Sequence, residues 1–202
     1  MLVLVLGGSG SGKSEFAEKV CMQLEPQEKL YIATMYPWDD ESKRKISRHI
    51  ELRKNKKFRT LECFYQMSKT LQSENVYATT VLLECMSNLL ANEMYCEEGI
   101  LSRYASKERQ EQITNSKDKL EVLVQEIMSG IDILSNQYKH VVIVSNDVFS
   151  DGVEYDESMQ EYLSALGQIN QEIAKKADIL AEVVCGIPII RKGEVCYEKI
   201  ME

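Results

Sequence analysis

The chain has 202 residues, 44% of them hydrophobic, which is enough for one well-buried α/β domain but short for two. Its formal net charge of −8 argues against non-specific binding to nucleic acid, and no apolar run approaches the ~18 residues that a membrane span needs. We therefore predict a single domain over residues 1–202, cytoplasmic, with neither nucleic acid nor a membrane as its partner.

The N-terminal segment predicts a strand, a phosphate-binding loop and a helix in succession. Residues 2–6 are aliphatic and lead into a Gly-x-x-x-x-Gly-Lys-Ser motif. In such a loop the glycines let backbone N–H groups surround phosphate oxygens, the lysine reaches the β- and γ-phosphates, and the serine hydroxyl ligates Mg²⁺. The helix predicted from residue 11 to about residue 24 directs its positive end at the same phosphates. The predicted phosphate-binding residues are Gly7, Gly8, Ser9, Gly10, Ser11, Gly12, Lys13 and Ser14.

The context of this motif separates it from a chance match. A Gly/Ser-rich turn that happens to fit the pattern is the alternative interpretation. The apolar strand before the motif, the helix after it and the Lys-Ser pair at its end disfavour that alternative.

A strand over residues 29–34 and a strongly basic helix are predicted next. The strand contains β-branched and aromatic residues, and its end is expected beside the phosphate loop, because ligands gather at the carboxyl ends of parallel strands. The helix is predicted to begin at the acidic residues 39–41 and to run through Arg53. Residues 43–59 hold nine basic side chains and one acidic one, so this segment has a charge of +8 and the rest of the chain −16.

His49 lies on this basic helix and is one of only two histidines in the chain. A neutral imidazole is a competent nucleophile toward an α-phosphate, and the neighbouring Arg48 and Arg53 are placed to hold anionic groups. Spacing alone favours the alternative, a solvated histidine on a charged helix with no catalytic task.

Two more strands are predicted over residues 58–62 and 79–84, with a helix over residues 64–71 between them. The second strand is apolar and ends in Glu84, as expected of the metal-side strand of a phosphate-loop enzyme. Glu84 is therefore a candidate for binding Mg²⁺ or its water shell. A carboxylate that simply ends a strand is the alternative.

The second half of the chain continues the alternation of helices and strands. A helix is predicted over residues 86–95, a helix with a buried apolar stripe over residues 120–134, a strand over 140–147, a helix over 157–176 and a strand over 179–185.

Three other features complete this half. Residues 97–112 are polar and predict an excursion on the surface. Asn146 and Asp147 end a buried strand and are placed to face ligand. Residues 187–194 predict a terminal β-ribbon that turns at residues 192–193. The alternation predicts an α/β, P-loop nucleotide-binding fold with a mostly parallel central sheet, helices on both faces and a short C-terminal β-ribbon.

Short motifs follow one another along nearly the whole chain. They are the phosphate loop, Tyr31-Ile32-Ala33-Thr34, Asp39-Asp40-Glu41, Ile46-x-x-His49, Arg59-Thr60-x-Glu62-Cys63, Leu82-Leu83-Glu84-Cys85, Asn146-Asp147-Val148 and Asn170-Gln171. The most specific of them is the Ile-x-x-His on a basic helix downstream of Tyr-Ile-Ala-Thr. In this order the motifs resemble the bifunctional adenosylcobinamide kinase and adenosylcobinamide-phosphate guanylyltransferase family of cobalamin assembly.

The resemblance implies two reactions. A kinase reaction phosphorylates the aminopropanol hydroxyl of adenosylcobinamide from ATP or GTP. A transferase reaction then moves GMP from GTP onto that phosphate through a guanylylated histidine, which His49 matches. It further implies a corrinoid substrate, Mg²⁺ held at Ser14 and Glu84, and a homo-oligomer, in the family's habit a trimer. The implied catalytic residues are His49 and Lys13, and the implied nucleotide-binding residues outside the loop are Ala33, Thr34, Arg48, Arg53, Glu62 and Glu84.

The chain departs from the family pattern in two places. Gly10 replaces an arginine that is common in the family's phosphate loop, which removes a cation from the triphosphate. Residues 147–155 lack the family's glycines after Asn146, which changes the backbone path. Two alternatives follow: another small-molecule kinase without a covalent step, or a GTP-binding homologue that has lost activity.

Overall fold

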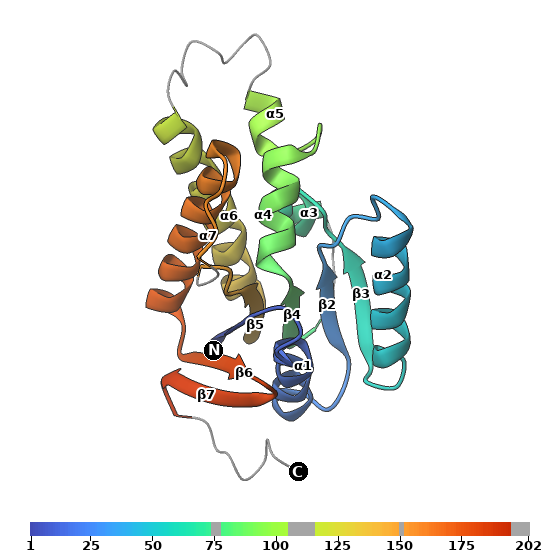
Figure 1. Ribbon diagram of the computed structural model, residues 1–202. Helices are drawn as coiled ribbons and strands as arrows, with labels where there is room; N and C mark the ends of the chain where they lie inside the picture. The colour runs from blue at the N-terminus through green and yellow to red at the C-terminus, as the bar shows by residue number, and fades with distance from the viewer. Residues whose placement is uncertain (74–77, 105–115, 150–151, 195–202) are drawn as a thin grey trace.

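The computed structural model describes residues 1–73, 78–104, 116–149 and 152–194, and within them one sheet organises the chain (Figure 1). The sheet has seven strands in the order β3-β2-β4-β5-β1-β6-β7. All neighbouring pairs are parallel except the last, β6 and β7, which are antiparallel. The strands are β1 (Leu2–Gly7), β2 (Lys29–Ala33), β3 (Phe58–Glu62), β4 (Thr80–Glu84), β5 (His140–Asn146), β6 (Ile179–Val184) and β7 (Ile187–Lys192).

Helices connect the parallel strands and cover both faces of the sheet. On one face, α3, α4, α6 and α7 pack over the larger core, and α1 packs over a smaller core on the other. The helices are α1 (Lys13–Leu24), α2 (Asp40–Arg53), α3 (Met67–Ser73), α4 (Met86–Tyr95), α5 (Ile100–Tyr104), α6 (Ser116–Gln137) and α7 (Glu157–Lys176).

Successive strand residues supply the two cores in alternation. In β1, Leu4 is buried in the larger core and Val5 in the smaller one. In β5, Ile143 and Val144 divide in the same way. Strands buried on both faces are continuous aliphatic runs rather than alternating ones, which is why these segments of the sequence predicted parallel strands correctly.

The strand register brings three polar positions to one edge of the sheet. Gly7, where the glycine loop begins, pairs with Asn146, and Ala33 pairs with Glu84 on one side and with Glu62 on the other. The carboxyl ends of β1, β2, β3, β4 and β5 therefore meet at the same edge, where open parallel sheets bind ligands.

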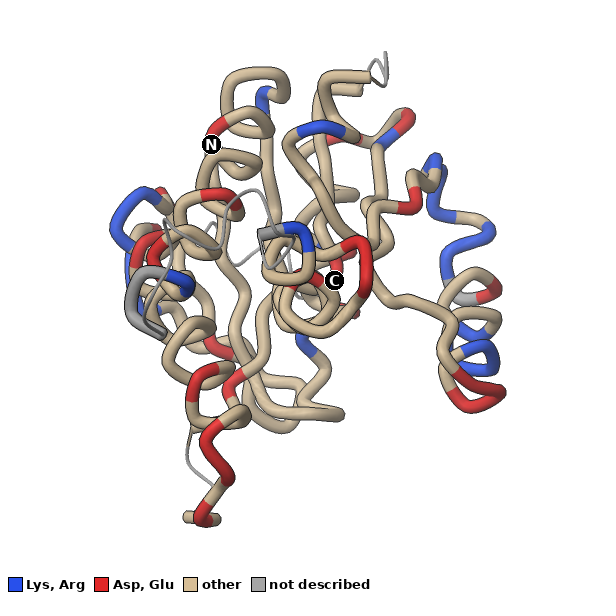
Figure 2. Tube along the Cα trace, turned by 90° about the horizontal axis from the view of Figure 1, so that it is seen from above, with Lys and Arg blue, Asp and Glu red and all other residues tan. Residues whose placement is uncertain are grey.

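Helix α2 lies at the outer edge of the sheet, beside β3, and most of its residues are exposed (Figures 1 and 2). Asp39 caps it, accepting a hydrogen bond from the Ser42 N–H at 2.7 Å, while the Ser42 hydroxyl accepts one from the Asp39 N–H at 3.0 Å. A capping box of this kind starts a helix without support from a buried face. The cap explains how such a polar helix can begin at the acidic residues 39–41, as the sequence predicted.

Three predicted boundaries are wrong, and positive φ angles explain them. Helix α1 begins at Lys13 rather than residue 11, because Gly12 has φ 90°. Helix α3 is displaced toward the C-terminus because Gln66, just before it, has φ 51°. The ribbon is formed by β6 and β7, and it turns at Cys185 and Gly186, with φ angles of 51° and 81°, rather than at residues 192–193.

The polar stretch predicted as a surface excursion contains the short helix α5, and its residues 105–112 lie outside the described part of the chain. Two residues of the divergent segment 147–155, at positions 150–151, also lie outside it. None of the described helices combines the length and the apolar character required to cross a membrane.

Candidate functional site

The loop between β1 and α1 has the backbone geometry of an anion cradle. A Cβ on Gly7 would lie 2.7 Å from the backbone oxygen of Val183, so only glycine fits there. Gly12 has φ 90° and precedes α1 without any side-chain hydrogen bond to cap the helix. The first N–H groups of α1 are therefore left for an anion, which the helix dipole also favours. The N–H of Gly186 donates to the Ser11 oxygen at 2.7 Å, so the ribbon turn braces the loop.

Lys13 is buried in this loop with its side chain folded back. Its Nζ donates to the backbone oxygen of Gly8 at 2.9 Å. Burial lowers the pKa of Lys13 below its usual value, and the nearby Cys85 and Glu84 oppose that shift. An ammonium group held with one carbonyl partner gains from a phosphate ligand, because a bound anion would compensate its lost hydration.

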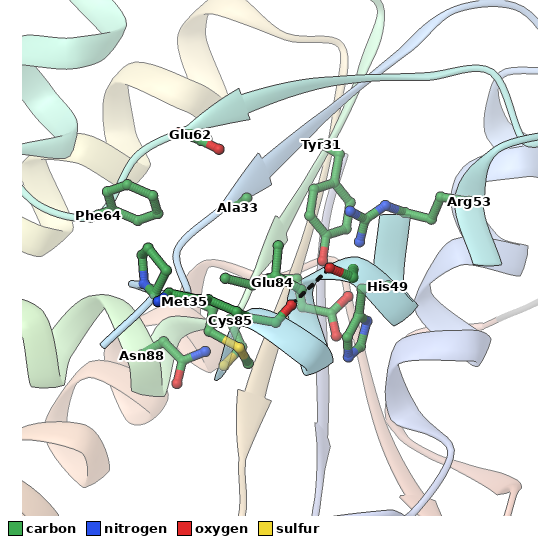
Figure 3. Close-up of a pocket in the computed structure, with 14 residues that line it drawn as sticks. Tyr31, Ala33, Met35, His49, Arg53, Glu62, Phe64, Glu84, Cys85 and Asn88 are labelled. Carbon is green, nitrogen blue, oxygen red and sulfur yellow. Dashed lines mark hydrogen bonds between the residues drawn. The ribbon is translucent and has the colours of Figure 1, made fainter. Parts of the chain in front are cut away.

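A cleft of about 320 Å³ opens between α2 and the carboxyl ends of β2, β3 and β4 (Figure 3). Five predicted site residues line it: Ala33, His49, Arg53, Glu62 and Glu84. They come from four different elements and are separated by up to 51 positions in the sequence, so folding alone brings them together.

The remaining predicted residues lie elsewhere. The side chain of Arg48 is exposed and does not line the cleft. Thr34 is fully buried, and its hydroxyl is hydrogen-bonded to the backbone of Cys85. The loop residues lie next to the cleft rather than in its lining, and Glu84 connects the two because it lines the cleft and acts on the pKa of Lys13.

The guanidinium of Arg53 is the most unusual group in the cleft. Arg53 is 6% exposed, and its Cζ lies 3.3 Å from the centroid of the Tyr31 ring, which indicates a cation–π contact. Its Nη1 is buried without a hydrogen-bond partner among the described residues. A buried guanidinium nitrogen without a partner is costly, so this position is suited to an anionic ligand.

His49 is half-buried on the face of α2 that borders the cleft (Figure 3). Within the described part of the chain no hydrogen bond holds either ring nitrogen. The ring can thus present a nitrogen lone pair to a group bound in the cleft.

Glu84 ends β4 at the floor of the cleft. Its Oε2 is buried and has no hydrogen-bond partner in the described residues. Like the Nη1 of Arg53, this oxygen is suited to pair with a group bound in the cleft. Hard cations such as Mg²⁺ prefer oxygen ligands of this kind.

The basic character of α2 is only partly neutralised within the helix (Figure 2). Exposed pairs join Lys43 to Asp40 and Lys45 to Glu41 at 3.4 and 2.7 Å. Exposed pairs of this type contribute little to stability. The arginines of the helix take no part in them, which leaves a positive surface around the cleft for a negatively charged ligand.

Sequence reasoning missed several groups that shape the cleft. Asn92 is buried on α4, and its Nδ2 donates to the backbone oxygens of Thr34 and Phe64, both at 2.8 Å. It thereby joins the ends of β2 and β3 beside the cleft. Glu18 of α1 forms an ion pair with Lys56, which follows α2. Neither pairing has a sequence signal, because each joins segments that are distant along the chain.

Asn146 and Asp147, which were expected to face ligand, do not line this cleft. They line a second one, of about 380 Å³, on the α7 side of the sheet. The described residues contain no cluster of three or more histidine, cysteine or acidic side chains that would form a metal site on their own.

Comparison with known proteins finds relatives over nearly the whole chain. The family model CobU, described as cobinamide kinase / cobinamide phosphate guanyltransferase, matches residues 3–190. The bifunctional adenosylcobalamin biosynthesis protein CobP of Pseudomonas aeruginosa is 27% identical over 191 residues, which cover 95% of this chain and 97% of that protein. The bifunctional adenosylcobalamin biosynthesis protein CobU of Salmonella typhimurium is 28% identical over 193 residues, covering 94% and 98%.

Among solved structures, the flagellar accessory protein FlaH of Methanocaldococcus jannaschii aligns with a TM-score of 0.48 and 14% identity, covering 96% of this chain and 78% of that one. The family match, by contrast, spans nearly the whole chain and includes both the glycine loop and the cleft. This protein belongs to the cobinamide kinase / cobinamide phosphate guanyltransferase family, whose members are nucleotide-dependent kinases and guanylyltransferases.

Proposed function

We propose that this protein phosphorylates adenosylcobinamide and then transfers GMP from GTP to the resulting phosphate, with His49 holding GMP between the two half-reactions of the transfer. The observation on which the proposal depends is the meeting of His49, the Arg53 Nη1 and the Glu84 Oε2 in one cleft beside the glycine loop, since neither of the last two atoms has a hydrogen-bond partner among the described residues. Each group has an unused capacity that a nucleoside triphosphate would satisfy.

The nucleotide would extend from the loop into the cleft. The uncapped end of α1 and Lys13 suit the β- and γ-phosphates, and Arg53 suits a phosphate nearer to His49. The aromatic Phe64 lines the same cleft and offers apolar surface to a base.

A magnesium ion fits the residues present. Ser14, in the first turn of α1, offers a hydroxyl oxygen, and Glu84 offers an oxygen that no described residue uses. Phosphate oxygens and water would supply the other ligands that Mg²⁺ needs. When bound, the ion would neutralise negative charge on the phosphates.

The transfer would consist of two displacements at the α-phosphorus. In the first, a neutral His49 nitrogen forms a bond to phosphorus, pyrophosphate leaves, and the ring loses its other N–H proton to solvent. In the second, a phosphate oxygen of adenosylcobinamide phosphate attacks the same phosphorus and the nitrogen–phosphorus bond breaks, after which the ring regains a proton. Arg53 stabilises the charge that develops in both steps, since its Nη1 has no partner within the described protein.

Labelling with α-³²P GTP and Mg²⁺ tests the proposal. We expect acid-labile label on the wild-type chain that maps to His49 and is absent from His49→Ala. His140→Ala is the matched control, because His140 is the other histidine and lies at the start of β5, at the opposite end of the strands. Label that survives in His49→Ala overturns the covalent step. Phosphoryl transfer to cobinamide without any labelled chain would instead indicate a kinase with no covalent intermediate.

A further inference from the structure

A second cleft of about 380 Å³ lies at the carboxyl ends of β5 and β1 and beside β6 and β7, where α7 packs on the sheet. It adjoins the glycine loop, because the Asp147 N–H donates to the backbone oxygen of Gly7 at 3.0 Å. Its polar lining residues include Asn146, Asp147, Asn170, Glu182 and Arg191. The nucleotide functions proposed for the first cleft use none of these five side chains.

Asn170 is the group in this cleft that the fold does not explain. It is 7% exposed, and its Oδ1 is buried without a hydrogen-bond partner among the described residues. Nearly all buried carboxamides in proteins are hydrogen-bonded, because an unpaired one loses its hydration without compensation. An unpartnered carboxamide in the wall of a cleft therefore points to a ligand that supplies the missing partner.

The charges around the cleft exclude a phosphate as that ligand. Arg191 is the one cationic residue among the described lining residues, and its Nε and Nη2 both donate to Oε2 of Glu182, at 2.8 and 2.6 Å. Asp147 adds a second carboxylate. A lining with two carboxylates and one engaged guanidinium repels anions, whereas it accommodates neutral donors and acceptors.

The rest of the lining is apolar and shaped by a helix glycine. A Cβ on Gly167 would lie 3.7 Å from the Phe149 ring. Because glycine has no side chain, the ring can lie close to the backbone of α7 at the edge of the cleft. Leu6 and Leu180 also line the cleft. The combination of apolar surface with a few convergent polar groups is typical of a site for a small organic molecule.

We propose that this second cleft binds carboxamide side chains of the corrinoid acceptor, with Asn170 pairing with one of them. The inference rests on the proposed function, which names cobinamide as the acceptor. Cobinamide has neutral carboxamides around its ring, and each offers an N–H to the Asn170 oxygen and a carbonyl to its nitrogen. The cleft lies beside Gly7, on the face of the sheet that α7 covers. The acceptor would therefore approach the glycine loop from that face, and α1 covers the opposite one.

Titration calorimetry with dicyanocobinamide, in the presence and absence of GDP, tests the inference. Asn170→Leu replaces the carboxamide with an apolar group that has the same number of heavy atoms and the same branching, and Gly167→Leu fills the space beside Phe149. We expect each to raise the Kd for cobinamide about tenfold or more, the size expected for a lost buried hydrogen bond or a blocked contact. The matched controls are Gln168→Leu, at an exposed position of the same helix, and Gly167→Ala, whose Cβ makes an ordinary contact; both should bind as the wild type does.

Thermal unfolding separates a ligand-binding role from a structural one. Because the buried Asn170 Oδ1 has no hydrogen-bond partner among the described residues, Asn170→Leu should keep or raise the Tm while it weakens cobinamide binding. Unchanged cobinamide affinity in both Asn170→Leu and Gly167→Leu overturns the inference, even when wild-type labelling at His49 upholds the proposed function. A wild-type protein that does not bind cobinamide at all overturns both.

Discussion

The hydroxyl of Thr34 donates a hydrogen bond to the backbone oxygen of Cys85 at 2.8 Å and accepts one from the N–H of the same residue at 2.7 Å. The Thr34 N–H also donates to the backbone oxygen of Glu84 at 3.1 Å. One buried residue thus binds the N–H and the carbonyl of Cys85 and the carbonyl of Glu84. The direction of the Glu84 carboxylate at the floor of the cleft depends on this clamp.

Replacing Thr34 with valine should destabilise the protein and weaken GTP binding. Valine has the same shape but leaves a buried N–H and a buried carbonyl of Cys85 unpaired, which costs about 2 kcal/mol or more in the free energy of unfolding. Urea denaturation and GTP titration measure the two effects. Thr34→Ser retains the hydroxyl and should recover most of both; equal losses in the two variants would show that the clamp is unimportant.

Arg53→Met should reduce GTP affinity by about 10- to 100-fold, the range expected for a charge-assisted hydrogen bond. Methionine preserves the contact with the Tyr31 ring and removes the buried nitrogen that has no partner in the described chain. Arg44→Met, at an exposed position on the same helix, is the control for net charge. If the two variants bind GTP equally, Arg53 contributes to GTP affinity only through the net positive charge of α2 and not through a direct hydrogen bond.

Gly7→Ala should abolish GTP binding and lower the Tm. The new Cβ would lie 2.7 Å from the backbone oxygen of Val183, so the loop must move away from the ribbon. Gly8→Ala is the control for stability, because a Cβ on Gly8 meets nothing within 4 Å. Differential scanning calorimetry measures the Tm of both variants. A lower Tm in Gly7→Ala alone would show that close packing at Gly7, rather than the loss of any loop glycine, causes the destabilisation.

The buried carboxyl of Glu18 should make stability depend on pH in a defined direction. Burial raises the pKa of Glu18, and its ion pair with Lys56 opposes that shift without cancelling it. The folded state therefore binds more protons than the unfolded state above the unfolded pKa of about 4.5. This contribution to stability is present at lower pH and is lost as the pH rises through the folded pKa.

Urea denaturation of the wild type and of Glu18→Gln at several pH values from 4 upward measures this effect. As the pH rises, the unfolding free energy of the wild type should fall relative to that of Glu18→Gln. Glu15→Gln changes an exposed carboxyl on the same helix and should show no comparable trend. A difference of the opposite sign would mean that the pair with Lys56 outweighs burial.

The sequence predicted the sheet and the loop because both depend on local chemistry. Aliphatic runs such as residues 141–144 form strands wherever both faces are covered, and the glycine loop has few backbone solutions. The ribbon turn was misplaced because Cys185 adopts a positive φ, which is uncommon for a residue other than glycine. The Lys192-Gly193 pair, seven residues after the end of the strand predicted over residues 179–185, was the stronger local signal.

The site divides in the same way. His49 and Glu84 were found from motif position, and both line the cleft. The stacking of Arg53 on Tyr31 and the isolation of Asn170 depend on which distant segments pack together, which no local pattern encodes. Thr34 was expected near the nucleotide, and its buried hydroxyl acts on the backbone beneath the cleft instead.

The hydrogen bond from the Gly186 N–H to the Ser11 oxygen has a consequence for synthesis on the ribosome. β1 precedes the other strands of this sheet in the sequence, yet it lies between β5 and β6, which are translated well after it. The glycine loop therefore lacks its contact with the ribbon turn until residue 186 has left the exit tunnel. A nascent chain stalled before that point should be unable to retain GTP, although its entire glycine motif was translated first.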